Sequence, residues 1–313
     1  MYCGENEFRE CVEAIERQTY KDWEHFVVSN LPNKKAHDTL YRTFMERAED
    51  FDLFLKIDAD MVIENTDLLA SIVEKFRTRA NMLHCAIPVY DFFSDQLIPE
   101  MNVYRSSVTW RPQDDLFPDT SWIAPEWVVR DTELAPAAIH CKNPSDFQAF
   151  HYGLHKGVKV IQAGRKHRKE SRARLHWSII SGIWRHLQRC PDRRLALAAL
   201  GSELALSRTL ALRHIDYEND ATWSIFRSYS SWSLQELESE AKGRRWANWG
   251  WLPHSLRLTA LSAPSSSIPD VPTVSKYLLR KGLVAGGRSV ARIRERLIRV
   301  AKINRLFIQI RRP

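Results

Sequence analysis

The stretch that decides the fold is Leu53-Phe54-Leu55-Lys56-Ile57-Asp58-Ala59-Asp60-Met61-Val62. Its first five residues are apolar except for Lys56 and show no alternation, which is typical of a strand buried on both faces. Asp58 and Asp60 follow where that strand should end. Ligands bind beyond the carboxyl ends of strands in open α/β sheets, so these carboxylates are candidate ligands of one divalent cation. Two aspartates at this spacing are also common in polar turns, so the pattern alone leaves both interpretations open.

Helix and strand patterns alternate on both sides of this stretch. Apolar residues at helical spacing predict helices over residues 7–18, 36–49, 66–77 and 143–157, the last ending at Gly157. Short apolar runs predict further strands over residues 23–28, 82–89, 101–104, 134–139 and 159–163. Such alternation favours parallel βαβ units. We therefore expect an α/β fold with a Rossmann-like, mostly parallel sheet, followed by a helical C-terminal region.

The alternation stops after Gly164, and the rest of the chain predicts a different organisation. Helical patterns follow a basic cluster at residues 165–174, and a capping-box start is present at Ser233. Proline and serine are enriched over residues 262–273, as in a linker. We therefore expect four parts: a catalytic domain at 1–165, a helical region at 166–261, a linker at 262–273 and a basic amphipathic tail at 274–313.

Composition places the 313-residue chain among soluble globular proteins, with 44% apolar and 27% charged residues. No run of 18 apolar residues is present, so we expect no membrane span, and the first residues do not resemble a signal peptide. The five cysteines are scattered and include no Cys-x-x-Cys pair. This argues against a disulfide framework or a zinc site and favours a cytoplasmic location.

The net charge of +8 is concentrated at one end of the chain. Residues 275–313 contain twelve basic residues and one acid, whereas residues 1–274 contain 34 basic and 37 acidic residues. Apolar and basic residues alternate along the tail at helical spacing, which predicts a helix that lies in an anionic membrane interface. The opposite expectation, that the tail binds nucleic acid, is weaker because the body is slightly acidic and shows no known binding motif.

A second motif carries a family resemblance. The passage Glu13-Ala14-Ile15-Glu16-Arg17-Gln18-Thr19-Tyr20-Lys21-Asp22-Trp23-Glu24 is similar to the helix-to-strand passage of family 2 glycosyltransferases. About forty residues later, Asp58-Ala59-Asp60 stands where those enzymes have their Asp-x-Asp motif. The resemblance covers roughly residues 1–165. It implies a GT-A fold and inverting transfer of a sugar from a nucleotide-sugar donor, with Mn²⁺ or Mg²⁺ as the cofactor.

The same resemblance implies roles for several residues. The metal would be held by Asp58, Asp60 and, as a third ligand, His140. His140 also has an ordinary interpretation as a hydrogen-bonded loop histidine. The nucleotide would lie against Tyr2, Gly4, Glu5, Asn30 and Asp58. In the family the domain opens with a strand ahead of these residues, and we expect that first strand to be missing here.

An inverting transfer needs a carboxylate that takes the proton of the acceptor hydroxyl. The resemblance implies that this base lies between the Asp-x-Asp motif and the late histidine. Asp119 is the first choice because its apolar neighbours would tune its pKa, and Asp115 and Glu126 are the next candidates. Trp110 lies close to these acids and either stacks on a sugar or belongs to the core.

The function expected from the sequence is therefore metal-dependent glycosyl transfer to a glycan or lipid-linked acceptor in cell-surface polysaccharide biosynthesis. The enzyme would be a cytoplasmic hexosyltransferase, peripheral at the inner face of the membrane. The alternative enzyme is a nucleotidyltransferase that acts on sugar phosphates, although no glycine-rich phosphate loop is visible. The alternative without catalysis is a nucleic-acid-binding protein that uses the basic tail.

Overall fold

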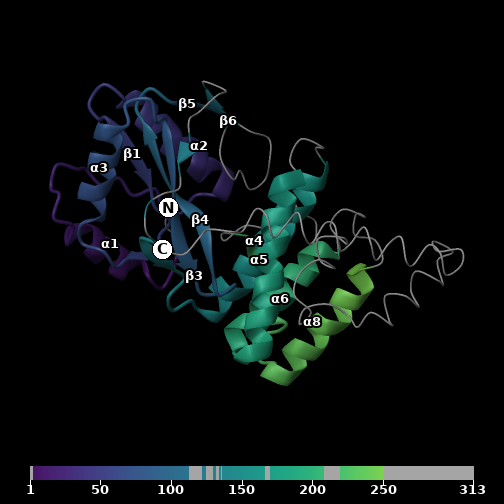
Figure 1. The fold of residues 1–313 in the computed structure, drawn as a ribbon. Coiled ribbons are helices and arrows are strands. Elements are labelled where there is room, and N and C mark those ends of the chain that lie inside the picture. Colours follow the sequence, from purple (N-terminus) through teal and green to yellow (C-terminus); the bar gives the residue numbers. More distant parts are fainter. Residues whose placement is uncertain are drawn as a thin grey trace, which may run out of the picture.

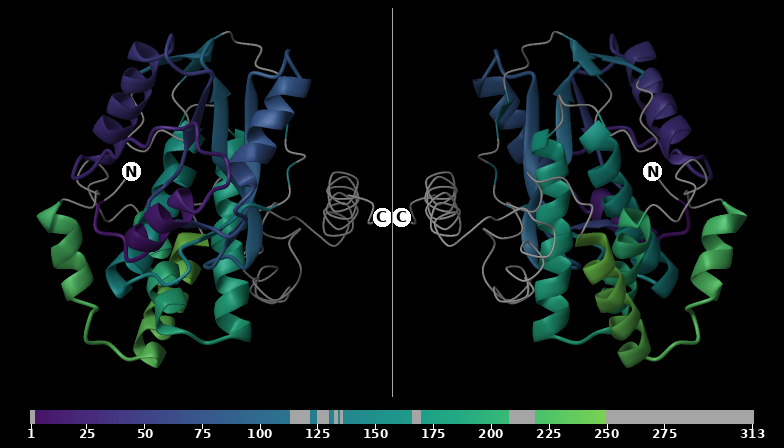
Figure 2. Two further views of the ribbon diagram at one scale, coloured as in Figure 1. Left: turned by 90° about the vertical axis from the view of Figure 1, so that its left-hand side faces the viewer. Right: turned by 90° about the vertical axis from the view of Figure 1, so that its right-hand side faces the viewer.

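The computed structural model describes residues 3–112, 122–124, 130–131, 134, 136–165, 170–207 and 219–249. It combines a mixed six-stranded sheet with eight helices in this part of the chain. Helices α1 (Phe8–Glu16) and α3 (Leu68–Thr78) lie on one side of β1, and α2 (Asn33–Glu46) lies on the other (Figure 1). The later helices form a separate layer at the other side, and these are α4 (Asp146–Arg165), α5 (Glu170–Arg189), α6 (Arg193–Leu206), α7 (Asp220–Arg227) and α8 (Leu234–Trp249) (Figures 1 and 2).

The sheet runs in the order β1-β4-β3-β8-β2, with β7 also paired to β3. Its strands are β1 (Leu53–Lys56), β2 (Met61–Ile63), β3 (His84–Asp91), β4 (Gln96–Arg105), β7 (Arg130–Asp131) and β8 (Ala138–His140). A separate pair consists of β5 (Thr109–Arg111) and β6 (Trp122–Ala124).

The mixed α/β class is as expected, but a mostly parallel sheet is not confirmed. Strand β3 pairs in parallel with β7 and β8, whereas β1 with β4, β3 with β4, and β2 with β8 are antiparallel. The physical reason is clearest between β3 and β4, where only residues 92–95 connect the strands. A connection this short joins antiparallel strands, because a parallel pair needs a crossover of a dozen or more residues.

Strands β1 and β2 stand at the two ends of the sheet order, yet only residues 57–60 connect them. Four residues span at most about 14 Å. The two ends of the sheet therefore approach each other at the turn that contains Asp58 and Asp60. The two faces of β1 pack against different apolar clusters, Leu53 and Leu55 against the main core and Phe54 against a second cluster. Three of its four residues are only partly buried, so the expected burial on both faces is incomplete.

Two of the strands expected from the sequence are absent. Residues 23–28 lie outside any strand. Residues 159–163 belong to α4, which continues through Gly157. The reason is that Gly157 lies against α6, where an added Cβ would come within 2.7 Å of Ala205 and Ser202, so this glycine allows close helix packing and does not end the helix.

The main core crosses the boundary expected at residue 165. It joins buried residues of α1, α3 and the sheet to those of α4, α5, α6 and α8, from Cys11 to Ala241. A second cluster contains Trp110, whose ring stacks on Tyr41 with centroids 5.0 Å apart. Trp110 is therefore a core residue. None of the helices within the described ranges is long and apolar enough to cross a membrane, and the linker and basic tail expected from the sequence lie outside these ranges.

Candidate metal centre

The register of strands β2 and β8 brings Asp60, His140 and Cys141 together. Strand β2 pairs with β8 so that Met61 lies opposite His140. The residue before Met61 is then adjacent to the residue after His140, and the N–H group of Cys141 donates a hydrogen bond to the carbonyl oxygen of Asp60 at 2.8 Å. Two segments about eighty residues apart in the sequence thus form one site.

The three side chains present their donor atoms to one another. The Oδ2 atom of Asp60 lies 3.4 Å from Nε2 of His140 and 3.1 Å from Sγ of Cys141. The Sγ and Nε2 atoms are 3.6 Å apart. Cys141 and His140 are buried, and the side chain of Asp60 is 13% exposed. Among the described residues, this is the group of histidine, cysteine and acidic side chains whose geometry fits a metal ion.

Two further features indicate that the residues fit a metal. The Oδ1 atom of Asp60 is buried and makes no hydrogen bond, although a buried carboxylate oxygen normally has a partner. Cys141 has a φ of 55°, in the left-handed region that non-glycine residues rarely adopt. Backbone strain of this kind persists where the surrounding structure enforces it, and it is frequent at binding sites.

Asp91, at the end of β3, fixes the orientation of the His140 ring by a hydrogen bond. Its Oδ1 atom accepts hydrogen bonds from Nδ1 of His140 at 2.8 Å and from the hydroxyl of Tyr152 at 3.1 Å. Its Oδ2 atom accepts the backbone N–H of Ser94 at 2.7 Å and the Ser94 hydroxyl. Because an ionised carboxylate only accepts hydrogen bonds, Nδ1 carries a proton and Nε2 is the nitrogen that can bind a metal.

Burial and the neighbouring side chains act in opposite directions on the pKa values of His140 and Asp60. Burial alone would lower the pKa of His140, but Cys141 and the carboxylates of Asp60 and Asp91 raise this pKa well above its ordinary value. Burial opposes ionisation of Asp60, yet His140 and the thiol of Cys141 hold the pKa of this carboxyl below its usual range. Without a metal ion, the imidazole and the carboxylate therefore form an ion pair.

Asp58 does not join this cluster. Its Oδ1 atom lies 2.6 Å from Nζ of Lys56, whose side chain is 7% exposed. Burial raises the pKa of Asp58, but the Lys56 charge outweighs it and the pKa lies well below the usual range. The sequence indicated that both aspartates face one cation. In the turn, Asp58 contacts Lys56 and Asp60 contacts His140. A metal role for Asp58 therefore remains a prediction.

A second charged group, missed by the sequence analysis, lies between β4 and α4. Glu100 forms an ion pair with the buried Lys156, with Oε1 and Nζ 3.3 Å apart. Burial raises the pKa of Glu100, but Lys156 and Lys159 lower it to about 2. The feature of the sequence that could have indicated this group is the spacing of Lys156 and Lys159, which lie three residues apart on the apolar face of a helix.

The residues expected to bind the nucleotide are placed as follows. Glu5 is half-buried and accepts the N–H of Cys3 at 2.6 Å, Gly4 and Asn30 are exposed with positive φ, and Tyr2 lies outside the described residues. Burial and the nearby charge of Asp60 raise the pKa of Glu5 to about 7. Glu5 therefore lies near the metal centre, and its role in nucleotide binding stays a prediction.

We predict that Glu5→Gln changes the pH dependence of folding. The pKa of Glu5 rises from 4.5 to about 7 in the folded chain, so the folded state loses stability as pH increases between these values. Glutamine removes this loss. The variant should gain about 1–2 kcal/mol relative to wild type between pH 4.5 and pH 8, measured by urea unfolding with a chelator present. Glu16→Gln, at an exposed position of α1, is the control, and an equal change in both variants would contradict the prediction.

The three candidate bases, Asp115, Asp119 and Glu126, all lie outside the described residues. The choice among them therefore stays a prediction from the sequence. The described part of the site contains the cluster of Asp60, His140 and Cys141 and the charges around it.

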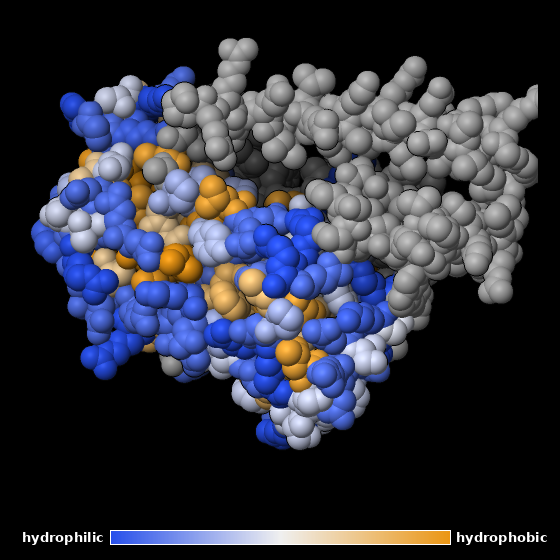
Figure 3. All heavy atoms as spheres, turned by 60° about the horizontal axis from the view of Figure 1, so that its bottom comes forward, coloured by the Kyte–Doolittle hydropathy of each residue, from blue (hydrophilic) through white to orange (hydrophobic). Residues whose placement is uncertain are grey.

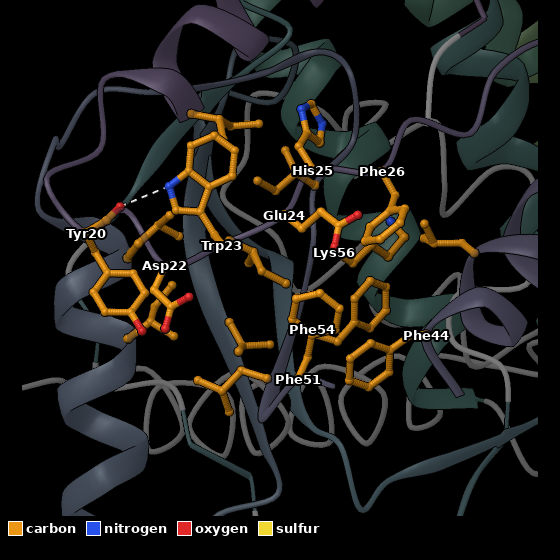
Figure 4. A pocket seen from close by; sticks show the side chains of 18 of the residues that line it. Tyr20, Asp22, Trp23, Glu24, His25, Phe26, Phe44, Phe51, Phe54 and Lys56 are labelled. Atoms are coloured by element: carbon orange, nitrogen blue, oxygen red, sulfur yellow. Dashed lines mark hydrogen bonds between the residues drawn. The ribbon is translucent and has the colours of Figure 1, made fainter. Parts of the chain in front are cut away.

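An apolar groove borders the Asp58–Asp60 turn. Its volume is about 350 Å³, and it runs between residues 22–27 and the outer edge of β1. Figure 4 shows Phe44, Phe51 and Phe54 gathered at one end, and Trp23 at the other, where its indole N–H donates to the carbonyl oxygen of Tyr20 at 2.9 Å. Phe26 and Val27, which line it, are 40% and 49% exposed. The lining suits an apolar ligand or an extended apolar segment.

Apolar groups also interrupt the polar surface on the face shown in Figure 3. The side chains of Asp60, His140 and Cys141 are at most 13% exposed. Comparison of the chain with protein families, with curated proteins and with solved structures found no match.

Proposed function

We propose that the protein is a metal-dependent, inverting glycosyltransferase that moves a sugar from a nucleotide-sugar donor to a glycan or lipid-linked acceptor in cell-surface polysaccharide biosynthesis. The observation that carries this proposal is the contact between Asp60 and His140, together with the buried Oδ1 atom of Asp60 that has no partner. These are two of the three side chains that the sequence resemblance implies as metal ligands.

A divalent ion held by Asp60 and His140 would supply positive charge to the diphosphate of the donor and to the departing nucleoside diphosphate. The chain's own residues prepare the site for such a ligand. Asp91 holds the proton of His140 on Nδ1, so that Nε2 is the nitrogen directed at the metal. Lys56 neutralises Asp58, which reduces the negative charge that an approaching diphosphate would meet.

The location of the protein is part of this proposal. A cytoplasmic enzyme that is peripheral at the inner face of the membrane would meet a lipid-linked acceptor there. The support is the net charge of +11 on residues 275–313, because each basic residue close to an anionic surface contributes about 1 kcal/mol.

The proposal is tested by thermal unfolding of the full chain with nucleoside diphosphates, in the presence and absence of Mn²⁺, Mg²⁺ or Zn²⁺. A diphosphate at a hundred times its dissociation constant should stabilise wild type by about 2.7 kcal/mol, and only with metal present. Asp60→Asn should lose this stabilisation, because its amide is a weak metal ligand, while its unfolding without ligand stays cooperative.

Asp220→Asn, at an exposed position of α7, is the matched control and should respond like wild type. The proposal is wrong if no nucleoside diphosphate stabilises the protein with any of the three metals. It is also wrong if Asp60→Asn retains the full metal-dependent effect. The donor is identified by testing which nucleotide sugar wild type hydrolyses, with release of the nucleoside diphosphate as the measured signal.

A further inference from the structure

We infer that Cys141 is a metal ligand, and that Asp60, His140 and Cys141 form a three-ligand centre that selects Zn²⁺ over Mg²⁺. This rests on the proposed metal dependence and changes the expected metal. The sequence resemblance implies Mn²⁺ or Mg²⁺, and the scattered cysteines argued against a zinc site. The structure places one of these cysteines in the centre.

The separations of the donor atoms match a tetrahedral metal. A zinc ion with bonds of about 2.0–2.3 Å to oxygen, nitrogen and sulfur places its ligand atoms about 3.3–3.6 Å apart. The observed separations are 3.4 Å between oxygen and nitrogen, 3.6 Å between sulfur and nitrogen, and 3.1 Å between sulfur and oxygen. All three lie within a few tenths of an ångström of those values, so an ion fits with little movement of the side chains.

The donor set also discriminates between metals. Thiolate and imidazole suit Zn²⁺, whereas Mg²⁺ takes oxygen ligands in octahedral geometry. A coordinating thiol is deprotonated when a divalent ion binds. The side-chain N–H of Gln148 lies 3.8 Å from Sγ of Cys141 and can stabilise the resulting thiolate. Three protein ligands leave a fourth position for water or a phosphate oxygen, as in catalytic zinc sites.

The backbone supports the same assignment. The left-handed conformation of Cys141 is strained for a residue that has a Cβ atom. The hydrogen bond from its N–H to the carbonyl oxygen of Asp60 holds this conformation. The strain therefore occurs at the residue that supplies the sulfur, next to the carboxylate whose second oxygen has no partner. A simple S–H donor to Asp60 would explain the 3.1 Å contact but not the buried Oδ1 atom that has no partner.

The test is a titration of metal-free, full-length protein with Co²⁺, which replaces Zn²⁺ and reports its ligands by absorption. Wild type should show visible d–d bands of tetrahedral Co²⁺ and an intense thiolate-to-cobalt band in the near ultraviolet. Zn²⁺ should displace the cobalt, and a large excess of Mg²⁺ should not. Cys141→Ser should lose the thiolate band and bind Zn²⁺ about 100-fold more weakly or worse, since loss of outer partners alone costs about 10–100-fold.

Cys190→Ser is the matched control because Cys190 is an exposed free thiol, and its spectrum should equal that of wild type. The wild-type spectrum is decisive even if Cys141→Ser fails to fold. Cobalt bands without a thiolate band would overturn the ligand assignment and leave the proposed metal dependence intact. Nucleoside diphosphate binding that needs Mg²⁺ or Mn²⁺ and ignores Zn²⁺ would also overturn it. Failure to bind any metal would overturn both this assignment and the proposed function, whereas metal binding without binding of any diphosphate would remove only the proposed function.

Discussion

Substituting alanine for Gly153 is expected to destabilise the protein by about 3 kcal/mol, the upper part of the usual range for overpacking in a core. Gly153 lies on α4 where this helix crosses α6, and a Cβ atom there would come 1.9 Å from the carbonyl oxygen of Ala198. Gly201 makes the reciprocal approach, since its Cβ would come 2.3 Å from the carbonyl oxygen of Phe150. The two helix backbones are therefore in direct contact, and the methyl group of an added alanine must push them apart.

The expected loss is large because α6 cannot move freely. Its residues from Leu195 to Leu206 are all buried, so a shift of the helix disturbs the core on every side. Alanine has a higher helix propensity than glycine by about 1 kcal/mol, which offsets only part of the cost. In a chain of this size the midpoint of thermal unfolding should fall by about 5–10 °C.

Gly243→Ala provides the matched control. Gly243 lies in α8, is exposed, and a Cβ there would meet nothing within 4 Å. The same substitution should therefore leave stability unchanged or raise it by up to about 1 kcal/mol. Urea and thermal unfolding of both variants, followed by circular dichroism, measure the difference. Equal stability of the two variants would show that α4 and α6 are packed less closely than described.

The sequence predicts the helices and strands better than their arrangement. Periodicity identified α1, α2 and α3, and the apolar run at 82–89 corresponds to β3. Periodicity does not identify the partner of a strand, however. The hairpin of β3 and β4 would have ruled out a parallel neighbour there. The first half of the strand at Gln96–Arg105 was missed because it contains Pro99 and Glu100, which are rare in strands.

The run at 159–163 shows why local patterns fail inside a helical layer. Val158, Val160 and Ile161 form an apolar, β-branched run, which is typical of a strand. In the structure these residues are buried on α4, which packs against α5, α6 and α7. Tertiary burial outweighs the intrinsic preference of such residues, and Gly157 contributes close packing in place of a helix end.

At the candidate site, the sequence identified the residues with a motif and missed those without one. Asp60 and His140 were chosen as ligands, and the structure brings them together. Both interpretations of His140 describe part of its environment, since Nδ1 is hydrogen-bonded to Asp91 and Nε2 faces Asp60. Cys141 was set aside because cysteine spacing finds only ligands that are close in sequence, whereas strand pairing joins ligands that are far apart.

Asp91→Asn is expected to have the second largest effect, weakening metal binding about 10–100-fold and destabilising the fold by about 2–3 kcal/mol. Asp91 is fully buried and accepts two hydrogen bonds on each carboxylate oxygen. An asparagine keeps the size of the side chain but replaces one acceptor with an NH₂ group. That group must then face either the backbone N–H of Ser94 or Nδ1 of His140.

Either orientation creates a conflict. Toward Ser94, the NH₂ group meets a backbone donor that cannot change its role, and the lost hydrogen bond destabilises the turn after β3. Toward His140, the conflict is relieved only if the imidazole proton moves from Nδ1 to Nε2. Nε2 then no longer offers a lone pair to a metal at the position next to Asp60. The substitution therefore links a stability defect to a metal-binding defect through the tautomer of one histidine.

The measurement combines urea unfolding without metal and Co²⁺ titration of the same preparation. Asp95→Asn is the control, because Asp95 lies four residues further in the same turn, is partly exposed, and has a φ of 51° that asparagine tolerates well. Its loss of a surface ion pair with Arg189 should cost at most about 1 kcal/mol and leave the metal affinity unchanged. If Asp91→Asn binds Co²⁺ as tightly as this control, the orientation of His140 does not depend on Asp91, and its ring is fixed by the contacts with Asp60 and Cys141 alone.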